Sequence, residues 1–280
     1  MAVTLKLLPP VEGLSFSEQE HRYTFSHPRL GVLPLYSCSQ VMEATEAKAM
    51  NWSHWRKRLM TKGLTEPEAE AADKLWPRGP LSLEQANCFM ELWRNHRAQV
   101  GTDFHAHVQS ALLRRPPPSV LHNEASSILD VWIDSLLPRI TDVFLIEQPL
   151  VHKACFFSGT PDLLAVIDGV LTLVDWKTQM LKYSPAGQPL APKVRPEWQM
   201  QQGAYAAMIE SCYGIKVERG MNWIGWAEGS KDHFWNAADL EQGWFKFAGF
   251  LMELHAREAR LGSIPHSIAM QAMAPMFSNG

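Results

Sequence analysis

Two aspartates and a lysine that interrupt apolar sequence are the residues with the clearest chemical potential in this chain. They lie in the stretch FFSGTPDLLAVIDGVLTLVDWKTQ, where Asp162 and Asp175 sit inside apolar runs and Lys177 follows the second acid. The intervening Asp168-Gly169 is a strong signal for a two-residue β-hairpin turn. In that register Asp162 faces Asp175. Because side chains alternate along a strand, Lys177 shares the face of Asp175, while Trp176 points to the other face.

Opposed carboxylates of this kind predict a metal site. Directly opposite Cβ atoms are roughly 5 Å apart, where like charges destabilise a sheet unless something compensates for them. A hard cation such as Mg²⁺ prefers oxygen ligands and retains waters for chemistry. Lys177 would then orient or help to deprotonate one of those waters and stabilise charge on a phosphate. Alternatively, Asp162 is a turn residue after Pro161, and Asp175 and Lys177 form a solvated pair at a sheet edge.

Pro161-Asp162 and Asp175-Trp176-Lys177 together resemble the two halves of the PD-(D/E)xK nuclease motif. The segment GTDFH, residues 101–105, resembles the G-T-x-x-H helix motif of the RecB-type exonuclease branch, and Gln201-x-x-x-Tyr205 resembles its Q-x-x-x-Y helix. HRYTF followed by YSCSQV is also similar to phage exonucleases and to the mitochondrial genome maintenance exonuclease. The resemblance extends from about His21 to at least Tyr205.

The resemblance implies a set of metal ligands. They are His105, Asp162, Asp175 and the backbone carbonyl of Trp176. An imidazole combined with carboxylates suits Mg²⁺ or Mn²⁺, and zinc is disfavoured because no cysteine joins the set. Glu147, on the strand before the hairpin, corresponds to an acid often found there in relatives.

Other interpretations of the individual residues remain open. Taken alone, His105 is typical of a core histidine, and His107, two residues further on, lies on a different helical face and is a poor second ligand. Gln201 and Tyr205 are four residues apart and share a helical face. The resemblance implies that they arrange the lysine or the nucleic-acid strand, whereas without it Tyr205 packs on Trp198 and Gln201 lies at the surface.

The loop between Met180 and Pro196 carries three cations, Lys182, Lys193 and Arg195. Long irregular loops in compact domains are often functional, and this one directly follows the candidate catalytic strand. We therefore expect it to guide a DNA strand over the metal. With so few charges, an exposed linker is the alternative.

The periodicity of the whole chain predicts an α/β fold. Alternating polar and apolar residues predict a small hairpin at 21–25 and 32–36, and later strands at 143–151, 153–158, 163–167, 170–176, 222–227 and 233–235. Helical patterns are expected at 39–62, 82–93, 100–115, 123–137, 197–211 and 239–261. The resemblance implies one restriction-endonuclease-like domain over residues 1–280, with a central mixed sheet flanked by helices. Its parts are a hairpin and helical region (about 15–140), the catalytic sheet and helices (about 141–262) and a loosely held tail (263–280).

Composition excludes several classes of protein. The formal net charge of -3 argues against a wholly basic surface, so any DNA contact must come from local clusters. Four widely spaced cysteines predict neither a disulfide framework nor an iron–sulfur cluster. The N-terminus lacks the features of a signal peptide and no long apolar run occurs, so we expect no membrane contact. The expected compartment is the cytoplasm of a bacterial or phage-infected host cell.

The sequence thus predicts a Mg²⁺- or Mn²⁺-dependent DNA exonuclease that hydrolyses phosphodiester bonds at linear ends. Such an enzyme would serve DNA recombination, repair or degradation, with a recombination protein as a possible partner. An endonuclease or junction resolvase on the same core is one alternative, because fold does not decide the cleavage mode. A non-catalytic DNA-binding or assembly protein is the other.

Overall fold

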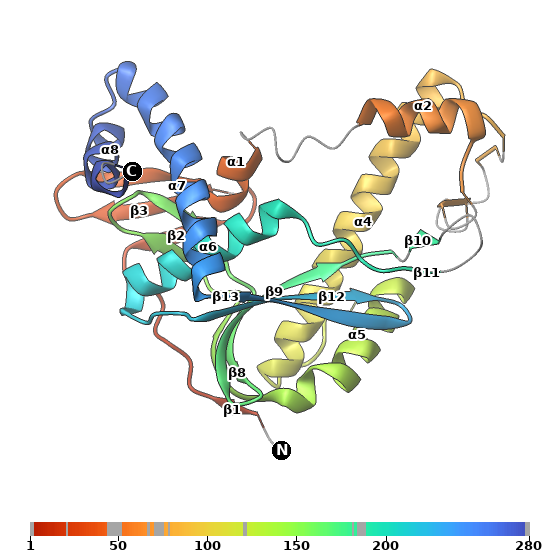
Figure 1. The fold of residues 1–280 in the computed structure, drawn as a ribbon, viewed down its shortest axis with the longest axis horizontal. Helices are drawn as coiled ribbons and strands as arrows, with labels where there is room; N and C mark the ends of the chain where they lie inside the picture. Colours follow the sequence, from red (N-terminus) through yellow and green to blue (C-terminus); the bar gives the residue numbers. More distant parts are fainter. Residues whose placement is uncertain are drawn as a thin grey trace.

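The computed structural model describes most of the chain. The described residues are 3–20, 22–43, 52–65, 68–69, 76–77, 79–119, 122–180, 182–183 and 189–277. Within them, mixed β-sheets lie at the centre and helices pack around them, with α2 and the adjoining end of α4 projecting to one side (Figure 1). The predicted α/β class is confirmed.

The larger sheet has six strands in the order β1-β5-β8-β9-β12-β13. Neighbours β1 and β5 are parallel, as are β9 and β12, and the other pairs are antiparallel. The strands are β1 (Thr4–Leu5), β5 (Ile140–Ile146), β8 (Leu163–Ile167), β9 (Val170–Thr178), β12 (Arg219–Trp226) and β13 (Gly229–Asn236). The predicted strands at 163–167, 170–176, 222–227 and 233–235 all belong to this sheet.

A second sheet has five strands in the order β2-β3-β4-β7-β6. They are β2 (Leu14–Ser17), β3 (Arg22–His27), β4 (Gly31–Ser37), β6 (Leu150–His152) and β7 (Phe157–Gly159), and a short pair, β10 (Lys182–Tyr183) and β11 (Pro189–Leu190), lies apart. The predicted N-terminal hairpin is confirmed as β3–β4. The single strand predicted at 143–151 is wrong: Glu147, with a φ of +45°, breaks it into β5 and β6, which join different sheets. The strand predicted at 153–158 is mostly a turn, and β7 begins only at Phe157.

The helices follow the predicted pattern with two differences. They are α1 (Cys38–Glu43), α2 (Trp52–Lys62), α4 (Leu83–Leu112), α5 (Asn123–Ser135), α6 (Pro196–Tyr213), α7 (Ala237–Arg260), α8 (Ile264–Phe277) and the 3-10 turn η2 (Leu137–Arg139). The helices predicted at 82–93 and 100–115 are one continuous helix, α4, which begins at the predicted Ser82 capping box. Of the helix predicted at 39–62, α1 and α2 are described, and 44–51 lie outside the described residues.

The tail predicted at 263–280 is the second difference, because residues 264–277 form α8. Ala269 and Met273 are fully buried, and α8 packs along α7. A hydrogen bond of 2.6 Å joins Nδ1 of His255 on α7 to Nδ1 of His266 on α8, and His255 Nε2 donates to the Cys155 carbonyl. This segment is rich in alanine and methionine, which favour helix. It has no Asp, Glu, Lys or Arg, so its packing against α7 buries no such charged side chain.

Helices cover both faces of the larger sheet. On one face, α4 and α5 bury a core that includes Phe104, Ile128, Trp132 and Trp223. The Trp176 side chain lies in this core with its ring edge-on to Phe104 and Trp132, so the prediction that it points to the other face from Asp175 and Lys177 is confirmed. On the other face, α6 and α7 pack against a second core shared with the smaller sheet. Neighbouring residues of β9 therefore point into different surroundings.

Two glycines let α6 and α7 touch backbone to backbone. A Cβ added at Gly203 would lie 2.1 Å from the Trp244 amide nitrogen, and one added at Gly243 would lie 2.1 Å from the Gln199 carbonyl oxygen. Neither backbone can yield without moving a whole helix. The contact therefore fixes the position of α6, which carries Gln201 and Tyr205.

We predict that Gly203→Ala lowers the free energy of unfolding by roughly 3 kcal/mol, because overpacking against a rigid backbone separates α6 from α7. Gly249→Ala on α7 is the matched control: its added Cβ meets nothing within 4 Å. Replacing this helical glycine is expected to stabilise the protein by up to about 1 kcal/mol. Urea unfolding of the two variants measures both effects, and equal stabilities would contradict the role of the contact.

Candidate metal centre

The β8–β9 hairpin has the predicted register. Ile167 pairs with Val170 and Leu163 with Val174 across a turn in which Asp168 and Gly169 both have positive φ, 51° and 78°. Positive φ at both central residues is the type I′ geometry that suits the twist of a two-residue hairpin. One step beyond β8, this register places Asp162 opposite Asp175, as predicted.

A row of polar residues crosses one end of the larger sheet. The Glu147 amide, just after β5, donates to the Asp162 carbonyl at 3.0 Å, and Asp162 precedes β8. Asp175 on β9 is paired in register with Asn222 on β12. Asp162, Asp175 and Asn222 are 7%, 1% and 0% exposed, so three members of the row are held away from water.

His105 reaches this row from α4. Its Nδ1 lies 2.7 Å from Oε1 of Glu147 and 3.7 Å from Oδ1 of Asp162. One potential ligand atom from each of these three residues lies within 4.8 Å of the other two. The positive φ of Glu147 is an uncommon conformation for a non-glycine residue, and it occurs where the chain leaves β5 and enters the site. Glu147, the further acid that the resemblance suggested, is therefore part of the cluster.

Crowded negative charge controls the ionisation of these groups. Burial alone would lower the pKa of His105, but the carboxylates of Asp162, Glu147 and Asp175 outweigh burial and raise the pKa to about 9. Burial raises the pKa of Asp162 well above its usual range, the His105 charge opposes this, and the neighbouring carboxylates add to it. The cluster is a place where a positive charge is strongly favoured.

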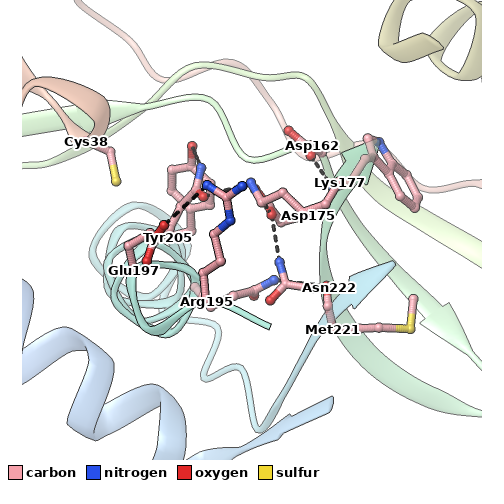
Figure 2. Close-up of polar contacts among 12 residues, drawn as sticks. Cys38, Asp162, Asp175, Lys177, Arg195, Glu197, Tyr205, Met221 and Asn222 are labelled. Carbon is pink, nitrogen blue, oxygen red and sulfur yellow. Dashed lines mark hydrogen bonds and ion pairs between the residues drawn. The ribbon is translucent and has the colours of Figure 1, made fainter. Parts of the chain in front are cut away.

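Lys177 is held between the row and α6. Its Nζ lies 2.6 Å from Oδ2 of Asp175 and donates to Oε1 of Gln201 at 2.9 Å. Gln201 in turn donates from Nε2 to the Tyr205 hydroxyl at 3.0 Å. Figure 2 shows Lys177 beside Asp175 on the side of the sheet that faces Tyr205. The predicted Gln201 and Tyr205 are therefore adjacent to the lysine.

Tyr205 is itself tightly enclosed. Its ring packs over Gly159, where an added Cβ would lie 2.8 Å from Cε1 of the ring. Burial raises the pKa of the Tyr205 hydroxyl well above its usual range, so the group is neutral. The neutral Tyr205 hydroxyl therefore accepts the hydrogen bond that orients Gln201.

Asp162 is fixed by the hairpin backbone. Its Oδ2 accepts a hydrogen bond of 2.6 Å from the Trp176 amide on the opposite strand. His107 is also accounted for, because its Nδ1 contacts the Asp103 carbonyl oxygen one turn earlier in α4 at 2.8 Å. It lies outside the ligand cluster, as predicted. The Trp176 carbonyl as a metal ligand stays a prediction.

The three cations predicted in the loop before α6 have different surroundings in the structure. The Lys182 side chain lies outside the described residues, and Lys193 is exposed. Arg195 forms a 3.7 Å ion pair with Glu197, and its guanidinium lies 6.0 Å from the centre of the Trp198 ring. Lys177 lies 5.8 Å from the same ring. Arg195 is thus brought to the neighbourhood of the candidate catalytic lysine.

The donor set suits a hard divalent cation. His105, Glu147 and Asp162 offer one imidazole nitrogen and carboxylate oxygens, and carboxylate oxygens are the ligands that hard divalent cations prefer. Asp175 lies opposite Asp162 in the hairpin register, and its Oδ2 already contacts Lys177 and Asn222. The cluster thus contains His105 and Asp162 of the predicted ligands together with Glu147, and Asp175 lies outside it on the next strand.

No protein-family model matches the chain, and a comparison with curated proteins finds no match either. In the part of the chain that the structure describes, no helix has the length and apolar character needed to cross a membrane.

We predict that Asp162→Asn stabilises the metal-free protein at neutral pH. A carboxyl whose folded pKa is raised contributes stability that is fully present below its unfolded pKa near 3.9 and is lost as the pH rises through the raised folded pKa. The amide oxygen can still accept from Trp176. Thermal melting in EDTA measures the effect, and a melting temperature below that of the unaltered protein would contradict it.

We predict that Asp168→Asn, on the same hairpin, changes the melting temperature in the opposite direction. The hydrogen bond and charge of Arg139 lower the pKa of Asp168, so the carboxylate favours the folded state at neutral pH. Its neutral replacement is therefore expected to melt at a slightly lower temperature, with a small effect because the side chain is half exposed.

Proposed function

We propose that this protein is a Mg²⁺- or Mn²⁺-dependent deoxyribonuclease of the PD-(D/E)xK type that degrades DNA from its ends. One observation carries the proposal: His105, Glu147 and Asp162 converge beside an Asp175–Lys177 pair on the adjacent strand of one hairpin. The mixed sheet with helices on both faces is compatible with a restriction-endonuclease-like core. The sequence resemblance supports the exonuclease branch, with a role in recombination, repair or degradation of DNA.

The bound metal would be held by His105, Glu147 and Asp162 with Asp175 beside it, and would supply an acidified water and shield a phosphate oxygen. Lys177 has three N–H donors, and two are directed at Asp175 and Gln201. No further hydrogen bond of this ammonium group occurs among the described residues, so its third donor is left for a water or a phosphate oxygen. Gln201, itself held by Tyr205, accepts from the ammonium group and fixes its position beside the Asp175 carboxylate.

A nuclease assay on matched linear and circular DNA, single- and double-stranded, tests the activity. We expect Mg²⁺- or Mn²⁺-dependent loss of linear DNA only, and a loss of roughly 10²- to 10³-fold in Lys177→Ala. Lys231→Ala, an exposed lysine on β13, is the control and is expected to retain activity. Cutting of circles would indicate an endonuclease or resolvase instead. Absence of cleavage with every metal would leave a DNA-binding or assembly protein.

We also predict that the cations before α6 contact the DNA backbone. Lys193→Ala with Arg195→Ala is expected to weaken DNA binding and to flatten the plot of log affinity against log salt by roughly two, one for each phosphate that is no longer neutralised. Arg257→Ala with Arg260→Ala, two exposed cations on the last turns of α7, is the matched control. Fluorescence anisotropy in EDTA measures binding without cleavage, and equal slopes for the two double variants would remove the loop from the DNA path.

A further inference from the structure

A fully buried asparagine continues the row of acids. Asn222 on β12 is 0% exposed and is the register partner of Asp175 on the neighbouring parallel strand. Its Nδ2 donates to Oδ2 of Asp175 at 2.7 Å, the contact drawn between these residues in Figure 2. A primary amide inside an otherwise apolar strand is costly to bury unless its hydrogen bonds are made. The contact with Asp175 satisfies only one end of the amide.

Trp235 satisfies the other end and fixes the direction of the amide. Its indole Nε1 donates to Oδ1 of Asn222 at 2.7 Å. Trp235 lies on β13, two residues beyond His233, the register partner of Asn222. An indole N–H is only a donor. Turning the amide over would therefore set its NH₂ group against the indole N–H and its oxygen against the Asp175 carboxylate.

The two buried aspartates use their oxygens in the same way. Oδ2 of Asp175 accepts from Nδ2 of Asn222 and contacts Nζ of Lys177, and Oδ2 of Asp162 accepts from the Trp176 amide. Among the described residues, Oδ1 of Asp175 has no hydrogen-bond partner, and Oδ1 of Asp162 has the 3.7 Å contact with His105. In each acid, one oxygen is held by donors and the other is left for a cation.

We propose that Trp235 and Asn222 form a positioning relay that locks the Asp175 carboxylate and presents its Oδ1 to the metal. This inference rests on the proposed metal-dependent function and names residues that support the same site. A neutral donor suits the position because it offsets the buried negative charge without adding a second cation. With leucine there, only Lys177 would hold Oδ2, and with aspartate a fourth carboxylate would join the row.

The test measures Mn²⁺ binding directly, by the electron paramagnetic resonance signal of free Mn²⁺. We expect Asn222→Leu to raise the Mn²⁺ dissociation constant about 10- to 100-fold, the cost typical of removing an outer partner of a metal ligand. Trp235→Phe keeps an aromatic ring and removes the N–H donor, and a rise of a few-fold is expected. If Asn222→Leu does not fold, Trp235→Phe alone decides.

Gln202→Met is the matched control for simple removal of a buried amide. Gln202 is also 0% exposed, and its Nε2 donates to the Met221 carbonyl, next to Asn222, without touching the acids. It is expected to leave Mn²⁺ affinity unchanged and to change the metal-free melting temperature only slightly, because the lost Nε2 hydrogen bond is offset by removal of Oε1, which is buried without a partner among the described residues. Equal changes in Mn²⁺ affinity in Gln202→Met and Asn222→Leu would reduce the relay to general packing.

The outcomes separate this inference from the proposed function. Unchanged Mn²⁺ affinity in folded Asn222→Leu or Trp235→Phe overturns the relay, whatever the nuclease activity. If the unaltered protein binds Mn²⁺ and its affinity falls on substitution but it cleaves no DNA, the relay stands and the nuclease proposal fails. If the unaltered protein binds no Mn²⁺, the relay is overturned, and the nuclease proposal is then decided by the cleavage assay with Mg²⁺.

Discussion

Mutual repulsion among carboxylates at one end of the larger sheet is the constraint on which the site depends. Glu147 follows β5, Asp162 precedes β8 and Asp175 lies on β9, and the two aspartates are almost completely removed from water. Burial of unpaired charge is far more costly than any single contact can repay. The surrounding groups offset this cost by directing positive charge or N–H donors at the row. They are the side chains of His105, Lys177 and Asn222 and the backbone amide of Trp176.

These compensating groups come from parts of the fold that lie far apart in the chain. His105 comes from α4, Lys177 from β9 itself, and Gln201 from α6. The site exists only where those elements meet, so their packing is part of its chemistry. The contact of α6 with α7 through Gly203 illustrates this, because it sets the depth at which Gln201 meets Lys177. A polar cluster on one sheet thus depends on an apolar helix pair.

The features predictable from sequence are those set by local rules. The Asp168-Gly169 turn fixes a register, and alternation then assigns Asp175, Trp176 and Lys177 to their faces. His105 became a candidate through family resemblance, since no local rule brings α4 to a strand end. Asn222 was missed, although a lone amide in the apolar run MNWIGW is the same kind of signal as the two acids. Its pairing with Asp175 joins parallel strands connected by a long crossover, and no turn specifies that register.

Other misses have a common origin in tertiary structure. Glu147 adopts positive φ where the chain passes from one sheet to the other, so the predicted single strand becomes two. Residues 264–277 carry no charge and form α8 against α7, a surface that only the folded molecule provides. Nothing in either segment's own sequence specifies the neighbour on which its conformation depends.

The length of α4 makes the site sensitive to a region that contains none of its ligands. The helix has 30 residues, about 45 Å, and one of its ends adjoins α2 (Figure 1). Phe89 packs with Leu59 of α2, whereas His105 lies nearer the C-terminal end of α4. Phe89 and His105 are about 24 Å apart along the axis. Over that length a rotation of about 5° moves the imidazole by about 2 Å, ten times the roughly 0.2 Å tolerance of a metal–ligand bond. The small core around Phe89 therefore helps to fix the orientation of α4. If this core were loose, the His105 imidazole would not be held where it can bind a cation.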